Sequence, residues 1–384
     1  MLPKSESSQR IKRLRERLAE ERVDGALFIY PIDILYFAGT RQNSALWVPV
    51  EGQPLLLVRK SLERAMKESA VSDVRPFPPS KELPSVFDEK IGKIGLTFDV
   101  LPVQHHAFYS GLLSGRQFVD ISTINRELRS VKSPWELERI QESGRKLAEV
   151  FSEIPGFLKP GMRELDLSAE LEYRLRKAGS EGRFTMRAFG QDIVGLAVSG
   201  RTASEAGCFD GPISGRGLSP AAPYGPSREM IMEHVPIVVD YAGAFEGYMA
   251  DMTRVFSFGD LRSDLKKAFE ASRAIQTWLA DNLAPGKICE GLYEGSVKMA
   301  REYGLEQYFM GQARFVGHGV GLELDELPVL AMGFKSALTA GQTVALEPKF
   351  VFPGEGAVGI ENTYAVTRSG CERLTVLPDD IVYL

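Results

Sequence analysis

The chain has 384 residues, of which 44% are hydrophobic and 25% are charged, and its formal net charge is -5. This length exceeds what one hydrophobic core usually organises, and the slightly acidic balance offers no basic field for a nucleic acid. The opening segment up to Glu21 is polar or charged, and no apolar run reaches the roughly 18 residues that would span a membrane. We therefore expect a soluble, cytoplasmic protein of two domains that binds neither nucleic acid nor membrane.

Cysteine usage agrees with a reducing compartment. The three cysteines, Cys208, Cys289 and Cys371, lie far apart and form no CxxC pattern. Their odd number and wide spacing argue against both a disulfide framework and a zinc knuckle.

The first third of the chain predicts an α/β domain, residues 1–130. An amphipathic helix is expected up to about Glu21, and three strand-like runs follow at 23–30, 54–60 and 93–98, separated by helical or polar stretches. Alternation of this kind is typical of a sheet covered by helices.

The second domain is predicted to span residues 131–384. Ser133 and Glu136, with a proline between them, form a capping box that starts a helix. Another helix is expected over 163–179, where a glycine ends it. Residues 190–225 are rich in glycine and proline and predict long loops, which are usually functional inside a compact domain.

A hairpin is predicted over residues 238–256, "VVDYAGAFEGYMADMTRVF". With a turn centred on Phe245 and Glu246, Asp240 and Asp251 face each other on one side of the hairpin. Like charges opposite each other destabilise a hairpin unless a positive charge lies between them. A divalent cation is the obvious candidate.

A second acidic hairpin is predicted over 344–366, where Glu347 and Glu361 are symmetric about Gly354. Between the hairpins, His318 is flanked by glycines that allow backbone to approach a ligand closely. Two Asp, two Glu and one His form an oxygen-rich set, larger than one tetrahedral zinc needs and suited to a pair of divalent ions. A glycosidase pair would need two of the acids and would leave two unexplained.

These motifs resemble the pita-bread-fold metallohydrolases, which include methionine aminopeptidase, aminopeptidase P, prolidase and the metal-free creatinase. Residues 10–40 look like the amino-terminal domain of the aminopeptidase P, prolidase and creatinase branch, and 128–147 with 158–172 look like the start of its catalytic domain. The resemblance implies a creatinase-like α/β domain followed by a pita-bread catalytic domain, a pseudo-twofold α+β fold. It also implies a homodimer.

The resemblance assigns a role to each ligand. Asp240 would bind one ion, Asp251 and Glu361 would bridge two ions, and His318 with Glu347 would complete the other. The cofactors would be two divalent metal ions, and Mn, Co, Zn and Fe all accept such ligands.

The chain departs from the family at two catalytic histidines. Where family peptidases carry a histidine after the His318 segment, this chain has Asp325, and where they carry another before Asp240, it has residues 222–224. We predict that Asp325 and Tyr224 replace these groups in catalysis, and the alternative for each is a surface or packing role. Glu347 is predicted to pass a proton to the leaving amine.

The predicted function is therefore a dinuclear metal-dependent peptidase, an aminopeptidase or dipeptidase that hydrolyses the amino-terminal bond of Xaa-Pro or similar short peptides. Two alternatives stay open because both histidines are absent. One is a relative that keeps the metals and acts on a non-peptide small molecule, with loop 200–227 shaping its pocket. The other is a metal-binding protein with little turnover.

Overall fold

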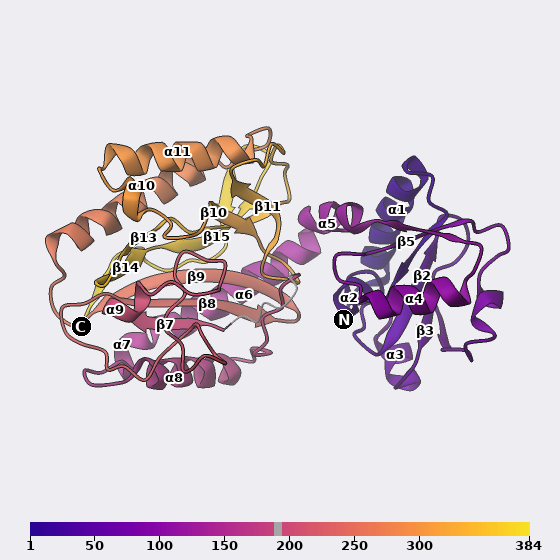
Figure 1. Cartoon of the computed structure of the whole chain (residues 1–384), viewed down its shortest axis with the longest axis horizontal. Helices are drawn as coiled ribbons and strands as arrows, with labels where there is room; N and C mark the ends of the chain where they lie inside the picture. The colour runs from indigo at the N-terminus through magenta and orange to yellow at the C-terminus, as the bar shows by residue number, and fades with distance from the viewer. Residues whose placement is uncertain (188–193) are drawn as a thin grey trace. The chain divides into compact units, whose positions relative to one another are not determined.

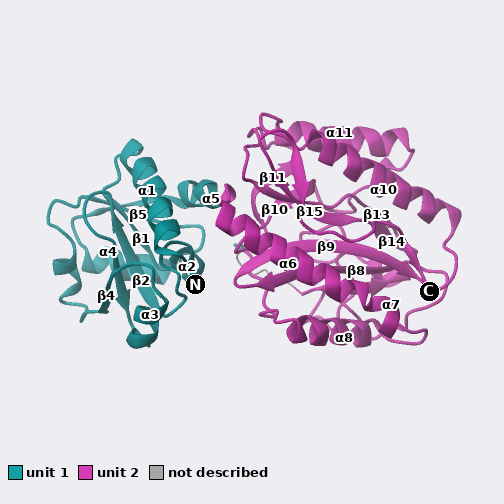
Figure 2. Ribbon diagram, turned by 180° about the vertical axis from the view of Figure 1, so that it is seen from behind, with its two compact units in different colours: residues 1–129, 187–189 teal, residues 130–186, 190–384 magenta. Residues whose placement is uncertain are grey.

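The computed structural model describes residues 1–187 and 194–384, which form two compact units (Figures 1 and 2). Unit 1 is Met1–Arg129 with a short later segment that includes Arg187, and unit 2 contains the rest of the chain from Ser130. The sequence analysis places its boundary one residue later. Within residues 1–187 and 194–384, no helix combines the length and the apolar content needed to cross a bilayer.

Unit 1 is an α/β domain, as predicted, built on a six-stranded mixed sheet in the order β4-β3-β2-β1-β5-β6. Its strands are β1 (Gly25–Phe28), β2 (Ser44–Pro49), β3 (Leu55–Val58), β4 (Asp73–Pro76), β5 (Lys93–Leu96) and β6 (Gln117–Asp120), and its helices are α1 (Lys4–Glu20), α2 (Pro31–Ala38), α3 (Leu62–Glu68), α4 (Val103–Leu112) and α5 (Ser122–Ser130). The three predicted runs are β1, β3 and β5. Strands β2, β4 and β6 were not predicted; the edge strands β4 and β6 are half exposed and carry little apolar sequence, whereas β2 is fully buried.

Unit 2 contains the larger sheet, in the order β11-β10-β12-β15-β9-β8-β7 among the described residues, with β16 beside β15, β17 beside β9, and β13 paired with β14. Its strands are β7 (Leu196–Ser199), β8 (Ile237–Phe245), β9 (Tyr248–Ser257), β10 (Phe315–Gly319), β11 (Glu326–Ala331), β12 (Thr343–Leu346), β13 (Lys349–Phe352), β14 (Gly356–Gly359), β15 (Glu361–Val366), β16 (Cys371–Arg373) and β17 (Val382–Tyr383). Its helices are α6 (Pro134–Ser152), α7 (Ile154–Phe157), α8 (Glu164–Lys177), α9 (Gly200–Ala203), α10 (Ser263–Asn282) and α11 (Cys289–Glu302).

Helices cover both faces of this sheet, as Figure 1 shows for α10 and α11 on one side and α8 on the other. Val238 and Val255 join a buried cluster with the apolar residues of α10 and α11, whereas Val239 and Phe256 join a cluster with those of α6 and α8. Successive strand side chains point to opposite faces. Asp240 has the parity of Val238, so it lies on the sheet face that packs against α10 and α11.

The predicted capping box is present at the start of α6. The Ser133 side chain accepts a hydrogen bond from the Glu136 backbone N–H, and the Glu136 carboxylate accepts one from the Ser133 N–H. These bonds satisfy two of the donors that a helix start leaves without partners. The local signal of the sequence was therefore sufficient to place this helix.

The prediction of loops over residues 190–225 needs a correction in the first part of this segment. Residues 190–193 lie outside the described residues, but β7 and α9 occupy 196–203. The run Leu196–Ser199 is fully buried and pairs with β8, so its apolar character was a strand signal that the surrounding glycines obscured. Beyond α9 the chain runs without helix or strand to β8.

Candidate metal centre

The hairpin of β8 and β9 carries both predicted aspartates, but not in the predicted register. Phe245 pairs with Tyr248, so the turn lies one residue later than expected, and Asp240 faces Thr253 while Asp251 faces Ala242. The two acids are diagonal neighbours on one face of the hairpin, where side chains are still within reach of each other. The prediction that Asp240 and Asp251 share one face of the hairpin is confirmed, but the prediction that they lie directly opposite each other is wrong.

Glu347 and Glu361 come from the second acidic segment. The β12–β15 and β13–β14 ladders both keep the register symmetric about Gly354, and Glu347 falls between the two ladders. Glu361 begins β15 and pairs with Thr253 of β9, which brings the second segment beside the first hairpin. The carboxylates of Asp240, Asp251, Glu347 and Glu361, the carboxylate cluster, all line one pocket.

His318 completes the set from β10. Its Nδ1 lies 3.0 Å from the Leu324 carbonyl oxygen and 3.2 Å from Asp325 Oδ1, so this nitrogen is the one that donates. Its Nε2 faces the cluster, 3.7 Å from Glu347 Oε1 and 3.8 Å from Glu361 Oε1. A histidine held through one nitrogen in this way offers the other to a metal.

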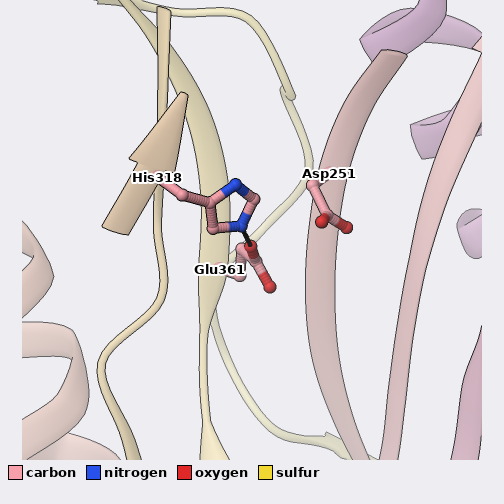
Figure 3. Close-up of side chains that lie close together, drawn as sticks. All are labelled: Asp251, His318 and Glu361. Atoms are coloured by element: carbon pink, nitrogen blue, oxygen red, sulfur yellow. Dashed lines mark ion pairs between the residues drawn. The ribbon is translucent and has the colours of Figure 1, made fainter. Parts of the chain in front are cut away.

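One cation site fits these residues. A ligand atom of each of Asp251, His318 and Glu361 lies within 4.8 Å of the other two, and Figure 3 shows the three side chains approaching from three different strands. All three residues are buried. Glu361 Oε1 is buried without a hydrogen-bond partner, which is unusual for a carboxylate oxygen, and a cation at this site would supply the missing partner.

A lysine that the sequence analysis missed occupies the other half of the cluster. Lys349 Nζ donates to Asp240 Oδ2 at 2.8 Å, to Glu347 Oε2 at 2.7 Å and to Glu361 Oε2 at 2.9 Å. The side chain is 1% exposed. A signal did exist, because Lys349 follows Glu347 by two residues and residues so spaced share a face of an extended chain.

The predicted second ion does not fit the cluster with this lysine in place. The ammonium already uses an oxygen from three of the four carboxylates, and a cation bound by those oxygens would require the position of Nζ. With Lys349 in this place, the ligand atoms that converge on a possible cation position among the described residues are those of Asp251, His318 and Glu361.

The electrostatics of the cluster favour positive charge. Burial raises the pKa of Asp251 well above its ordinary value, and the charges of Glu361 and Asp240 raise it further. Burial lowers the pKa of Lys349, but the three carboxylates that it contacts outweigh this and raise it well above its ordinary value. Burial also lowers the pKa of His318, but the surrounding carboxylates outweigh this effect and raise the pKa to about 10. The raised pKa values of Lys349 and His318 reflect the negative charge of the carboxylates around them, whereas that of Asp251 reflects burial first and its acidic neighbours second.

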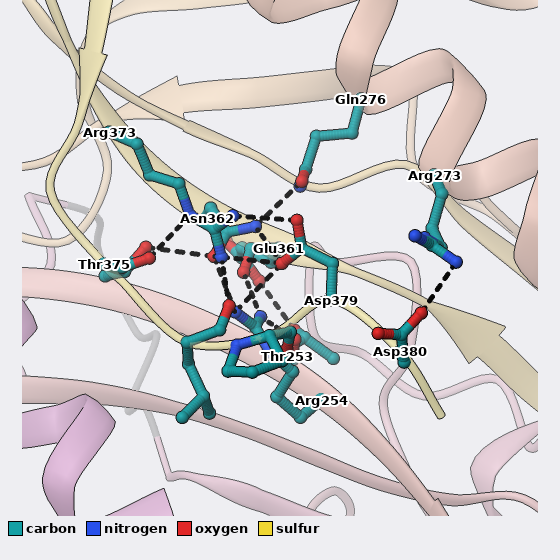
Figure 4. Close-up of polar contacts among 12 residues, drawn as sticks. Thr253, Arg254, Arg273, Gln276, Glu361, Asn362, Arg373, Thr375, Asp379 and Asp380 are labelled. Carbon is teal, nitrogen blue, oxygen red and sulfur yellow. Dashed lines mark hydrogen bonds and ion pairs between the residues drawn. The ribbon is translucent and has the colours of Figure 1, made fainter. Parts of the chain in front are cut away.

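A polar network behind the cluster fixes the backbone of β9 and β15 (Figure 4). Thr253 Oγ1 donates to Glu361 Oε2 at 2.8 Å. The buried Arg254 guanidinium donates to the Glu361 carbonyl oxygen and to Asn362 Oδ1, and it also bonds the carbonyl groups of Leu377 and Pro378 near the carboxyl terminus. Groups that orient a ligand in this way commonly matter almost as much as the ligand.

The two residues predicted to replace the missing histidines have different positions relative to the pocket. Asp325 lines the pocket and contacts His318, so its carboxylate is placed to orient a ligand. Tyr224 is not among the described residues that line the pocket, and its ring packs against Phe209, which does. Their catalytic roles stay predictions.

The pocket above the cluster is small and partly aromatic. Phe184, Phe209, Phe315 and Leu324 line it together with the cluster and Lys349. Its free volume is about 50 Å³, enough for an ion and a few water molecules.

A pita-bread unit with a buried centre of carboxylates and one histidine, preceded by an α/β unit, defines the class of two-domain metallohydrolases. Residues 138–368 match Metallopeptidase family M24, and residues 10–131 match the Creatinase/Prolidase N-terminal domain. The chain belongs to Metallopeptidase family M24, whose name denotes metal-dependent peptidases.

Similar proteins extend over the whole chain. The Xaa-Pro dipeptidase of Pyrococcus furiosus is 25% identical over 371 residues, covering 96% of this chain and 97% of its own length. The uncharacterized peptidase YqhT of Bacillus subtilis is 24% identical over 387 residues, covering 98% and 100%. The structure of the Xaa-Pro dipeptidase from Bacillus anthracis matches with a TM-score of 0.86 at 24% identity, covering 98% of this chain and 100% of that one. This structural likeness confirms the predicted fold.

Proposed function

We propose that the protein is a metal-dependent hydrolase that cleaves the amino-terminal amide bond of short peptides, with Xaa-Pro dipeptides as the first substrates to test. The observation that carries the proposal is the buried site of Asp251, His318 and Glu361, with its unpartnered carboxylate oxygen. Family membership and the names of relatives such as the Xaa-Pro dipeptidase of Pyrococcus furiosus support the peptidase class. A divalent ion, when bound, lowers the pKa of water and polarises a substrate carbonyl.

Glu347 is the group that we assign to proton transfer. Its Oε2 accepts a hydrogen bond from Lys349, whereas its Oε1 lies 3.7 Å from His318 Nε2. The carboxylate is thus held by one oxygen at the wall of the pocket. A carboxylate positioned in this way can take a proton from water and deliver it to the leaving amine.

The wall of the pocket indicates the kind of side chain that the substrate carries. Phe184, Phe209 and Phe315 provide an apolar surface beside the polar cluster. Binding sites combine such surfaces with a few polar groups that fix orientation. Proline, or another compact apolar residue next to the scissile bond, suits this wall.

A second candidate function is hydrolysis of a non-peptide small molecule, and a third is metal binding with little turnover. The observation behind both is that His318 is the only histidine among the described residues that line the pocket. Peptide hydrolysis benefits from hydrogen-bond donors that hold the oxyanion, and the loss of one such donor typically costs about 10²-fold to 10³-fold in rate.

A substrate panel separates these functions. Protein stripped with a chelator and reloaded with Mn²⁺, Co²⁺, Zn²⁺ or Fe²⁺ would be assayed with Xaa-Pro dipeptides, Xaa-Pro tripeptides, proline-free dipeptides and N-acyl amides. We expect metal-dependent release of the first residue, abolished by Asp251→Asn and retained by Asp281→Asn, a matched change at an exposed residue. Cleavage of N-acyl amides alone would favour the second candidate, and a bound ion without any hydrolysis would favour the third.

A further inference from the structure

We propose that the Lys349 ammonium takes the place of one of the two cations that the carboxylate cluster would otherwise bind, so that the protein holds a single divalent ion. This inference deepens the proposed function and rests on the metal-binding part of it. It concerns the number of ions, which can be measured without any turnover.

The Lys349 ammonium has all of its hydrogen-bond donors occupied by carboxylates. An ammonium group has three hydrogen atoms, and its three hydrogen bonds go to three different carboxylates at 2.7–2.9 Å. The group is therefore fully satisfied inside the cluster, with no need of a water molecule or another residue. Asp240 and Glu347 each direct one oxygen at Nζ, and these two acids lie outside the three-residue site at Asp251.

The charge balance of the cluster also favours a single divalent ion. The four carboxylates can carry four negative charges, and one ammonium with one divalent ion neutralises three of them. A second divalent ion close to the ammonium would add repulsion between like charges in a buried site, where screening by water is weak.

The strand opposite Lys349 supplies an independent observation. Lys349 of β13 pairs directly with Gly359 of β14. A Cβ atom on Gly359 would lie 2.5 Å from Lys349 Cγ and 2.8 Å from its Cα, closer than side-chain carbons approach. The backbone of Gly359 is not in the left-handed region, so the glycine is needed for space and not for conformation. The hairpin is thus shaped to let the lysine stem pass into the cluster.

The experiment counts bound Mn²⁺. Parent protein, Lys349→Gly, Lys349→Met and the exposed control Lys335→Met would be dialysed against Mn²⁺ and analysed by inductively coupled plasma mass spectrometry. We expect one ion per chain in the parent and the control, and two in the Lys349 variants. Electron paramagnetic resonance should show an isolated Mn²⁺ signal in the parent and an exchange-coupled pair in the variants, because the added ion would share Glu361 with the first.

The outcomes separate this inference from the proposed function. The difference between variant and parent, one ion, tests the inference, whereas the parent's own value tests metal dependence. Two coupled ions in the parent, or one ion in every variant, would overturn the inference and leave the hydrolase proposal standing. No ion in the parent would overturn the metal dependence of the proposed function, and the single-ion inference that rests on it would fall as well.

A measurement on the parent alone guards against variants that fail to fold. Anomalous diffraction at the manganese edge from parent crystals grown with Mn²⁺ should show one peak, beside Asp251, His318 and Glu361. A second peak bound by Asp240 and Glu347 would overturn the inference.

Discussion

At the scale of single residues, the centre depends on the hydrogen bonds that orient each candidate ligand. His318 uses Nδ1 for the Leu324 carbonyl and Asp325, which leaves Nε2 for the ion. Asp325 therefore has a structural explanation that does not require contact with substrate. Asp325 also lines the pocket, so it is close enough to contact a substrate. Its orienting role predicts a change in metal affinity, whereas the predicted catalytic role implies a change in turnover.

We expect Asp325→Asn to weaken Mn²⁺ binding about 10-fold, the lower end of the range for groups that orient a metal ligand, because an amide can still accept the histidine N–H but carries no charge. Isothermal titration calorimetry measures the affinity, with Asp281→Asn as the matched control. Unchanged affinity together with a lower turnover number would instead assign Asp325 to the substrate.

At the scale of elements, a buried carboxylate fastens the segment that follows β7. Glu164, at the first position of α8, accepts hydrogen bonds from the Ser199 N–H at 2.6 Å, from the Ser227 N–H at 2.9 Å and from the Ser227 hydroxyl at 2.7 Å. The Thr202 hydroxyl donates to the same side chain. One residue thus joins α8, α9 and both ends of the segment from which Phe209 enters the pocket wall.

We expect Glu164→Gln to lower the free energy of unfolding by about 1–3 kcal/mol, because one amide end would present a donor to groups that are themselves donors. A change of this size in a domain of comparable length moves the melting temperature by roughly 2–4 °C for each kcal/mol. Circular dichroism measures it. The control is Glu172→Gln at an exposed position of the same helix, and equal melting temperatures for the two variants would show that the contacts of Glu164 contribute little.

At the scale of the whole molecule, the two units have separate cores. The core of unit 1 includes Leu27, Leu57 and Ile94 from three of its strands, and it shares no residue with the two clusters that flank the sheet of unit 2. All ligands of the candidate centre belong to unit 2. Metal binding should therefore stabilise one unit directly. The homodimer implied by the family resemblance stays a prediction, and light scattering tests it.

Adding Mn²⁺ to chelator-treated protein should slow amide hydrogen exchange in peptides from β8, β9, β10 and β15 but not in peptides from β1 to β6. An ion at 100 times its dissociation constant stabilises the state that binds it by about 2.7 kcal/mol. Mass spectrometry resolves the peptides. Asp251→Asn should show no such effect, and equal slowing in unit 1 would mean that the two units unfold together.

The pita-bread class of the second unit was predicted from the family resemblance. The sequence by itself determined the α/β class of the first unit, the capped start of α6, the two acidic hairpins and the histidine between them. These features depend on local patterns, namely period-two or helical apolar spacing and turn residues. Only the tertiary structure decided the register of the first hairpin, the strand inside the 190–225 segment and the presence of Lys349 in the cluster. The physical reason is that a strand's neighbours come from distant parts of the chain, so the charge that a lysine meets depends on pairing that its own sequence does not encode.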